Sequence, residues 1–106
     1  PELVRQFFLD GPRLLSAQRQ AFSAGKAADL CRAAHSLKSA AATFGAMALS
    51  AVSKELEMRT KAGTLTGAEA LVARCEQEYV RAQAEIERAR KRISFERPSP
   101  GQNQGG

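Results

Sequence analysis

The sequence of 106 residues has no tryptophan, one tyrosine and an aromatic content of only 6%. Valine and isoleucine are scarce, whereas alanine is abundant. Because alanine suits helices and β-branched residues suit sheets, this composition disfavours a β-rich fold and favours an all-α one. The length, with a hydrophobic content of 43%, allows one domain with a modest core.

Long apolar runs are also missing. None approaches the roughly 20 residues that a membrane-spanning helix needs, and no signal peptide is visible. We therefore expect no membrane contact by this domain and a cytoplasmic location. The chain starts at Pro1 without a methionine, so we expect a fragment or a processed chain.

Metal-binding residue types are rare. Cys31 and Cys75 lie far apart without a CxxC pattern, and His35 is the only histidine. A structural zinc site takes about four such ligands, so we expect no metal site. Two reduced thiols in a cytosolic protein are the favoured interpretation, and a disulfide is the alternative.

The net charge of +5 is unevenly distributed, because residues 86–106 alone carry a net charge of +3. These residues include five cations and two carboxylates, namely Arg88, Arg90, Lys91, Arg92 and Arg97 against Glu87 and Glu96. A basic cluster at the end of a helix usually complements the helix dipole. Nucleic-acid binding is disfavoured, because only Phe95 lies among these cations to stack on a base.

Apolar residues at helical spacing predict four helices. The predicted helices cover residues 2–24, 26–44, 46–62 and 66–93. Gly25, Gly45 and Gly63 are the predicted stop signals. Pro12 follows Gly11 inside the first helix, so a kink or break is expected there. The apolar stripes of the first and third helices are Leu3, Phe7, Leu14, Ala21 and Phe22, and Leu49, Val52 and Leu56.

The fourth predicted helix opens with Thr66 and, three residues later, Glu69, which is the pattern of a capping box. Its apolar residues alternate steps of four and three, as in the seam of a supercoiled helix pair. The seam consists of Ala68, Val72, Cys75, Tyr79, Ala82, Ile86, Ala89 and Ile93. It fits either a bundle edge or a dimer interface, and the bundle is favoured because the other three helices also have apolar stripes to bury.

Four amphipathic helices joined by short loops predict an all-α, antiparallel (up-down) four-helix bundle over residues 1–93. Residues 94–106 are polar and rich in proline and glycine, without any helical period. We expect them to form a flexible C-terminal tail or linker.

His35 is the residue most indicative of function. At about 100° per residue, the apolar residues of its helix fall on one stripe, and His35 points away from that stripe toward water. The stripe consists of Leu30, Ala33, Ala34, Leu37, Ala41 and Phe44, whereas His35 is flanked by Cys31, Lys38, Ser39 and Ala42. An imidazole displayed among small side chains is accessible to a partner, although an incidental surface histidine has the same periodicity.

This arrangement suits a phosphoryl carrier. Phosphorylated histidine is a phosphoramidate, and its phosphoryl group is readily passed on. Lys38 stands one turn after His35, where its ammonium can neutralise phosphoryl oxygens. Ser39 and Ala42 are small, so the active site of a partner can approach closely. No second catalytic base is required, because the partner can supply the metal and the acceptor.

The segment Ala34-His35-Ser36-Leu37-Lys38-Ser39 resembles the histidine-containing phosphotransfer (HPt) domain family, which has an A-H-x-L-K-G core. The resemblance continues through a glycine ten residues after the histidine, within Phe44-Gly45-Ala46, and through a leucine-spaced helix ending in Leu56-Glu57. Residues 7–15 also resemble the preceding helix of the family. The match covers roughly residues 3–90.

The resemblance implies that His35 accepts a phosphoryl group and exchanges it with an aspartate of response-regulator receiver domains. It implies that Lys38 steadies the phosphoryl group. It also implies that Glu57, where relatives carry Gln or Glu, orients the imidazole by accepting from Nδ1–H. A solvated Glu57 beside Lys54 and Lys61 is the alternative.

Cys31, Ser39 and Ala42 are the residues expected to contact the docked receiver. Ser39 replaces the glycine that the family prefers, which predicts altered partner preference rather than lost docking. We expect the short helix that often opens the family's bundle to be truncated before Pro1. No cofactor is expected on this domain, since Mg²⁺ belongs to the partner receiver.

The sequence contains no P-loop and no glycine-rich ATP lid, so the domain is expected to act as a carrier rather than an enzyme. Its expected partners are receivers and a sensor or hybrid histidine kinase, of which it would be the C-terminal domain if it is not free-standing. An autokinase is disfavoured because Ser36 follows His35 in place of an acidic residue. Two alternatives remain, a phosphoryl-accepting substrate domain of a chemotaxis-type kinase and a structural module that dimerises through the fourth helix. We expect a monomer.

Overall fold

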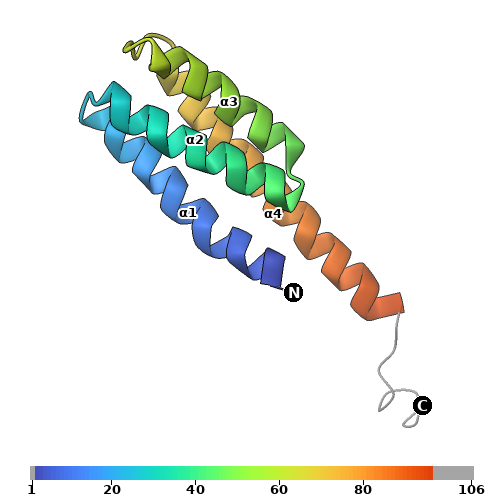
Figure 1. Cartoon of the computed structure of the whole chain (residues 1–106). Coiled ribbons are helices and arrows are strands. Elements are labelled where there is room, and N and C mark those ends of the chain that lie inside the picture. Colours follow the sequence, from blue (N-terminus) through green and yellow to red (C-terminus); the bar gives the residue numbers. More distant parts are fainter. Residues whose placement is uncertain (1, 97–106) are drawn as a thin grey trace.

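The computed structural model describes residues 2–96, which form four helices. They are α1 (Glu2–Ser23), α2 (Ala27–Phe44), α3 (Met47–Lys61) and α4 (Ala68–Glu96). Successive helices run in opposite directions, and α1 and α3 each pack against both α2 and α4 (Figure 1). The predicted antiparallel four-helix bundle is therefore confirmed.

The ends of the helices follow the predicted glycine signals. Gly45 closes α2 with a φ of 99°, a left-handed conformation that glycine adopts without strain. Its backbone N–H donates to Ala41 O at 2.9 Å, and the N–H of Ala46 donates to the same oxygen at 2.8 Å. These bonds satisfy carbonyls that the end of α2 would otherwise leave unpaired, and they turn the chain directly into α3.

One local prediction is wrong in part and another is wrong. Of the kink or break expected at Pro12, the break does not occur, since α1 continues through the exposed proline without interruption. The capping box at Thr66 does not form, because α4 begins two residues later, at Ala68. The Thr66 hydroxyl instead accepts a hydrogen bond from the Thr64 hydroxyl at 2.9 Å.

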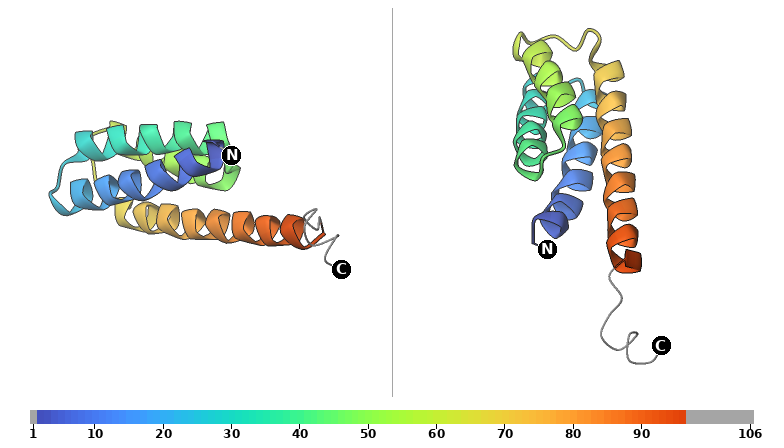
Figure 2. Two further views of the ribbon diagram at one scale, coloured as in Figure 1. Left: turned by 90° about the horizontal axis from the view of Figure 1, so that it is seen from below. Right: turned by 90° about the vertical axis from the view of Figure 1, so that its right-hand side faces the viewer.

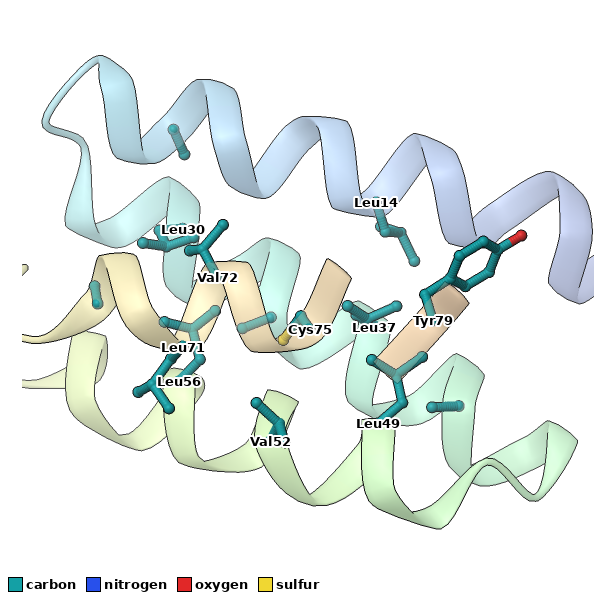
Figure 3. Packing of buried hydrophobic residues seen from close by; sticks show 14 of the residues in the cluster. Leu14, Leu30, Leu37, Leu49, Val52, Leu56, Leu71, Val72, Cys75 and Tyr79 are labelled. Atoms are coloured by element: carbon teal, nitrogen blue, oxygen red, sulfur yellow. The ribbon is translucent and has the colours of Figure 1, made fainter. Parts of the chain in front are cut away.

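The core is formed by aliphatic side chains from all four helices. Leu30 and Leu37 of α2, Leu56 of α3 and Val72 of α4 are completely buried, and they meet along the axis of the bundle (Figure 3). Full burial of a side chain of this size stabilises the fold by about 1.5–3 kcal/mol. These contacts fix which face of α2 is left for solvent.

Helix α4 packs closely against α1 through Tyr79 and Gly11. The phenol ring lies so near the α1 backbone that a Cβ at position 11 would overlap it. The ring of Phe7 stacks on Phe44 with centroids 4.4 Å apart and also contacts Tyr79 at 5.2 Å. This aromatic cluster joins α1, α2 and α4 at one level of the bundle.

The predicted seam of α4 is only partly internal. Its first four members, from Ala68 to Tyr79, are buried, whereas Ala82, Ile86 and Ala89 are half-buried and Ile93 is 53% exposed. The reason is length, because α4 continues past the ends of the other helices to Glu96 (Figure 2). Of the predicted tail, residues 94–96 belong to this helix, and residues 97–106 lie outside the described residues.

Within residues 2–96, no helix is both long enough and apolar enough to cross a membrane.

Candidate phosphoryl-accepting site

His35 stands on the solvent face of α2, as predicted. The apolar stripe of α2 is buried except for the half-buried Phe44, whereas the His35 side chain is 60% exposed. Because the stripe anchors α2 firmly, the backbone that carries the imidazole has a fixed position. The imidazole is therefore rigidly supported and open to a partner at the same time.

Glu57 of α3 holds one side of the imidazole. Its Oε2 lies 2.8 Å from His35 Nδ1. The carboxylate is only 16% exposed, so it approaches the ring from between α2 and α3 rather than from solvent.

The same carboxylate also pairs with Lys38. Glu57 Oε1 lies 2.8 Å from Lys38 Nζ, so that one carboxylate bridges the histidine and the lysine. The Lys38 ammonium and, to a smaller extent, the His35 imidazole hold the pKa of Glu57 below its ordinary value, and partial burial opposes them. Glu57 is therefore ionised at neutral pH.

The ionised state of Glu57 determines which nitrogen of His35 carries the hydrogen. A carboxylate can only accept hydrogen bonds, so Nδ1 must be the donor. In a neutral imidazole with its hydrogen on Nδ1, Nε2 has a free lone pair. The arrangement thus leaves Nε2 as the ring nitrogen with an unshared electron pair on the exposed imidazole.

The three residues predicted for receiver docking have different environments. Ser39 and Ala42 are exposed on α2, on either side of the buried Ala41. Cys31 is half-buried, and its thiol donates to the backbone carbonyl of Glu57 at 3.5 Å. Ser39 and Ala42 therefore leave the solvent side of α2 free of bulk, whereas the thiol of Cys31 is directed toward α3.

Sequence reasoning missed one residue near this site. The Ser50 hydroxyl of α3 donates to the backbone carbonyl of Lys38 at 3.1 Å, although Ser50 is almost fully buried. A signal was present in the sequence, because Ser50 lies beside the core position Leu49 and seven residues before Glu57. A serine at such a position is expected to be buried and therefore hydrogen-bonded, although the sequence does not show to which partner.

No group of three or more metal-binding side chains occurs within residues 2–96. The positive charge beside the imidazole is that of Lys38, and the free surface next to it is that of α2. A small helical bundle with one accessible, oriented imidazole defines a class of protein, the histidine phosphoryl carriers.

Comparison with known proteins identifies the family within this class. The family model of the Hpt domain matches residues 2–91. A crystal structure of histidine-containing phosphotransfer protein B (HptB) from Pseudomonas aeruginosa PAO1 superimposes with a TM-score of 0.82. The two sequences are 34% identical, and the alignment covers 87% of this chain and 80% of that one. Among curated proteins, no sequence matches this one.

The chain belongs to the Hpt domain family. Its function is histidine phosphotransfer in a two-component phosphorelay, and members of the family carry phosphoryl groups rather than catalyse a reaction alone.

Proposed function

We propose that His35 is the phosphoryl-accepting residue and that it exchanges the group with an aspartate of a response-regulator receiver domain. The observation that carries this proposal is the hydrogen bond between Nδ1 and the Glu57 carboxylate, which leaves Nε2 free on an exposed ring. His35 is also the only histidine in the chain.

The transfer step needs few groups from this domain. The lone pair of Nε2 attacks the phosphorus of the receiver's aspartyl phosphate. A nitrogen–phosphorus bond forms while the bond between phosphorus and the carboxylate oxygen breaks, and the electron pair leaves with the aspartate. The reverse step returns the group to a receiver. In this proposal Mg²⁺ is held by the receiver and none by this domain.

Glu57 and Lys38 assist different parts of this step. The ring gains positive charge as the nitrogen–phosphorus bond forms, and the Glu57 carboxylate beside Nδ1–H stabilises that charge. Lys38 offers its ammonium to the phosphoryl oxygens as a point charge. Lys38 is 30% exposed and lies one turn from His35, so it can move toward the group without a change in the fold.

We further propose that the domain works as a monomer in the cytoplasm, together with a sensor or hybrid histidine kinase. Burial of Ala68, Val72 and Cys75 inside the bundle supports the monomer, because that part of the seam is already covered. Sedimentation equilibrium tests it, and a stable dimer at micromolar concentration would contradict it.

The test of the proposed function is transfer from a panel of phosphorylated receivers to the wild-type domain and to His35→Gln. Acid-labile, base-stable label on the wild type alone supports the proposal. Circular dichroism of His35→Gln serves as the control, because an exposed substitution leaves the helices intact. Label obtained only from a separate kinase domain with ATP would reassign the chain as a chemotaxis-type substrate domain. No label from either source would reject phosphoryl transfer.

A further inference from the structure

Two hydrogen bonds connect α2 and α3 on either side of the site. The Cys31 thiol of α2 donates to the carbonyl of Glu57, and the Ser50 hydroxyl of α3 donates to the carbonyl of Lys38. We call these two bonds the α2–α3 clasps. In both, the accepting carbonyl belongs to one of the two residues that assist His35.

The clasps are reciprocal and evenly spaced. Cys31 and Lys38 are seven residues apart on α2, and Ser50 and Glu57 are seven residues apart on α3. Seven residues make about two helical turns, or about 10 Å. Each helix therefore supplies one donor side chain and one acceptor carbonyl, and the bonds lie two turns apart along an antiparallel pair. His35 lies between them in the sequence of α2.

The clasps do not disturb either helix. A carbonyl oxygen has two lone pairs, so it can accept a side-chain hydrogen bond in addition to its bond within the helix. The Thr60 hydroxyl also lies 3.3 Å from the Glu57 carbonyl, but its shorter bond is to Leu56 O at 2.8 Å, and Thr60 belongs to α3 and does not connect the helices. Cys31 and Ser50 are thus the side chains that tie the backbones of these two residues to the neighbouring helix.

We propose that Cys31 and Ser50 are positioning residues, which fix the register of α3 against α2 so that one Glu57 carboxylate reaches both His35 and Lys38. A slip of α3 by one residue would displace it by about 1.5 Å. The same slip would also turn position 57 by about 100° around the axis of α3, so its carboxylate would no longer point at the His35 Nδ1 that now lies 2.8 Å from Oε2.

This inference rests on the proposed function for its kinetic consequence only. The orientation of the imidazole can be measured without any phosphoryl donor, because ¹⁵N chemical shifts of His35 report which ring nitrogen carries the hydrogen. The two readouts therefore separate a failure of the clasps from a failure of phosphoryl transfer.

The experiment compares Ser50→Ala, Cys31→Ala and their combination with the wild type. Each single variant is expected to increase the population of rings with hydrogen on Nε2 and to slow phosphoryl acceptance about threefold, as expected for the loss of one neutral hydrogen bond. The combination is expected to slow it about tenfold. Cys31→Ser keeps a donor at the same place, so the hydrogen of the His35 ring is expected to stay on Nδ1 as in the wild type.

Ser53→Ala is the matched control. Ser53 lies one turn from Ser50 on α3 and is also buried, but its hydroxyl donates to Leu49 O within the same helix at 2.8 Å. Its loss is expected to lower the melting temperature without changing the ¹⁵N shifts of His35. Equal shifts for Ser50→Ala and Ser53→Ala would overturn the positioning role.

A second control places Ser50→Ala in a Glu57→Ala background. If Ser50 acts through Glu57, removing its hydroxyl there is expected to cause no further change in the ring or in the transfer rate. An equally large additional effect would show that Ser50 acts elsewhere. If the wild type accepts no label but the ¹⁵N shifts of His35 change in the variants as described, phosphotransfer is rejected and the positioning role of the clasps is still supported.

Discussion

The carboxylate of Glu57 is expected to assist His35 in two separable ways, by orienting the ring and by balancing its charge. Glu57→Ala removes both effects, whereas Glu57→Gln keeps an oxygen that can accept from Nδ1–H and removes only the charge. The two substitutions therefore divide the contribution of a single side chain. Both leave the apolar core unchanged, because Glu57 lies at its edge.

The expected loss of transfer rate follows from the hydrogen bond that each substitution removes or weakens. A hydrogen bond to a charged group contributes about 1.5–3 kcal/mol, and a neutral one about 0.5–1.5 kcal/mol. The lower end of each range applies, because the His35 side chain is 60% exposed and water screens the pair. Glu57→Ala is thus expected to raise the barrier by about 1.5 kcal/mol, a tenfold slower transfer. Glu57→Gln keeps a neutral hydrogen bond, which contributes about 0.5 kcal/mol. It is therefore expected to raise the barrier by only about 1 kcal/mol, which makes transfer about fivefold slower.

The assay is the rate of label transfer from one phosphorylated receiver, measured at saturating domain concentration so that docking does not limit it. Glu55→Gln is the matched control, since Glu55 lies on the same helix but is 52% exposed and pairs with Arg59. Its rate is expected to equal that of the wild type. If Glu57→Ala transfers within twofold of the wild type, or if Glu55→Gln is equally slow, the reasoning about the carboxylate is refuted.

Three further predictions concern stability. Leu37→Ala truncates a completely buried side chain and is expected to lower the free energy of unfolding by about 2–5 kcal/mol; an unchanged melting temperature would contradict the assigned core face. Gly11→Ala places a methyl group against the Tyr79 ring. It is expected to lower the free energy of unfolding by about 1–3 kcal/mol, measured by chemical denaturation, although alanine has the better helix propensity. Ser16→Ala, on the exposed side of α1, is the control and is expected to cause no such loss. The pKa of Glu57 is lowered in the folded state, so its carboxylate stabilises the fold above the ordinary value of 4.5, and this contribution is lost as the pH falls through the folded-state pKa. Thermal melts between pH 6 and pH 3 are therefore expected to show a smaller loss of stability for Glu57→Gln than for the wild type, and parallel curves would exclude this linkage.

The fold was accessible from the sequence because each helix has a strong local signal. The apolar stripe of α2 and the glycine that ends it depend only on helical geometry and on backbone sterics. The exposure of His35 follows from the same angular argument. For these features, neighbouring residues along the chain contain all the information that is needed.

Other features depend on contacts between helices, which one sequence does not reveal. Leu3 belongs to a regular apolar stripe, yet it is 56% exposed near the start of α1. Gln18 is polar, yet it is completely buried. The bridge from Glu57 to His35 and Lys38 requires a particular register of α3 against α2. The family resemblance suggested the contact with His35 but not the one with Lys38, and the residues alone left a solvated glutamate equally acceptable.

Substitutions on the two faces of α2 are expected to have different effects on stability. Substitutions at Leu30 or Leu37 act on the core, where changes of volume cost several kcal/mol. Substitutions at the exposed Ser36, Ser39 and Ala42 are expected to change stability by no more than about 0.5 kcal/mol. If a receiver docks on these residues, as the family resemblance implies, this face can diverge between duplicated copies of the gene while the bundle stays intact. A few surface substitutions can then make one copy specific for a different receiver, without any compensating change in the core.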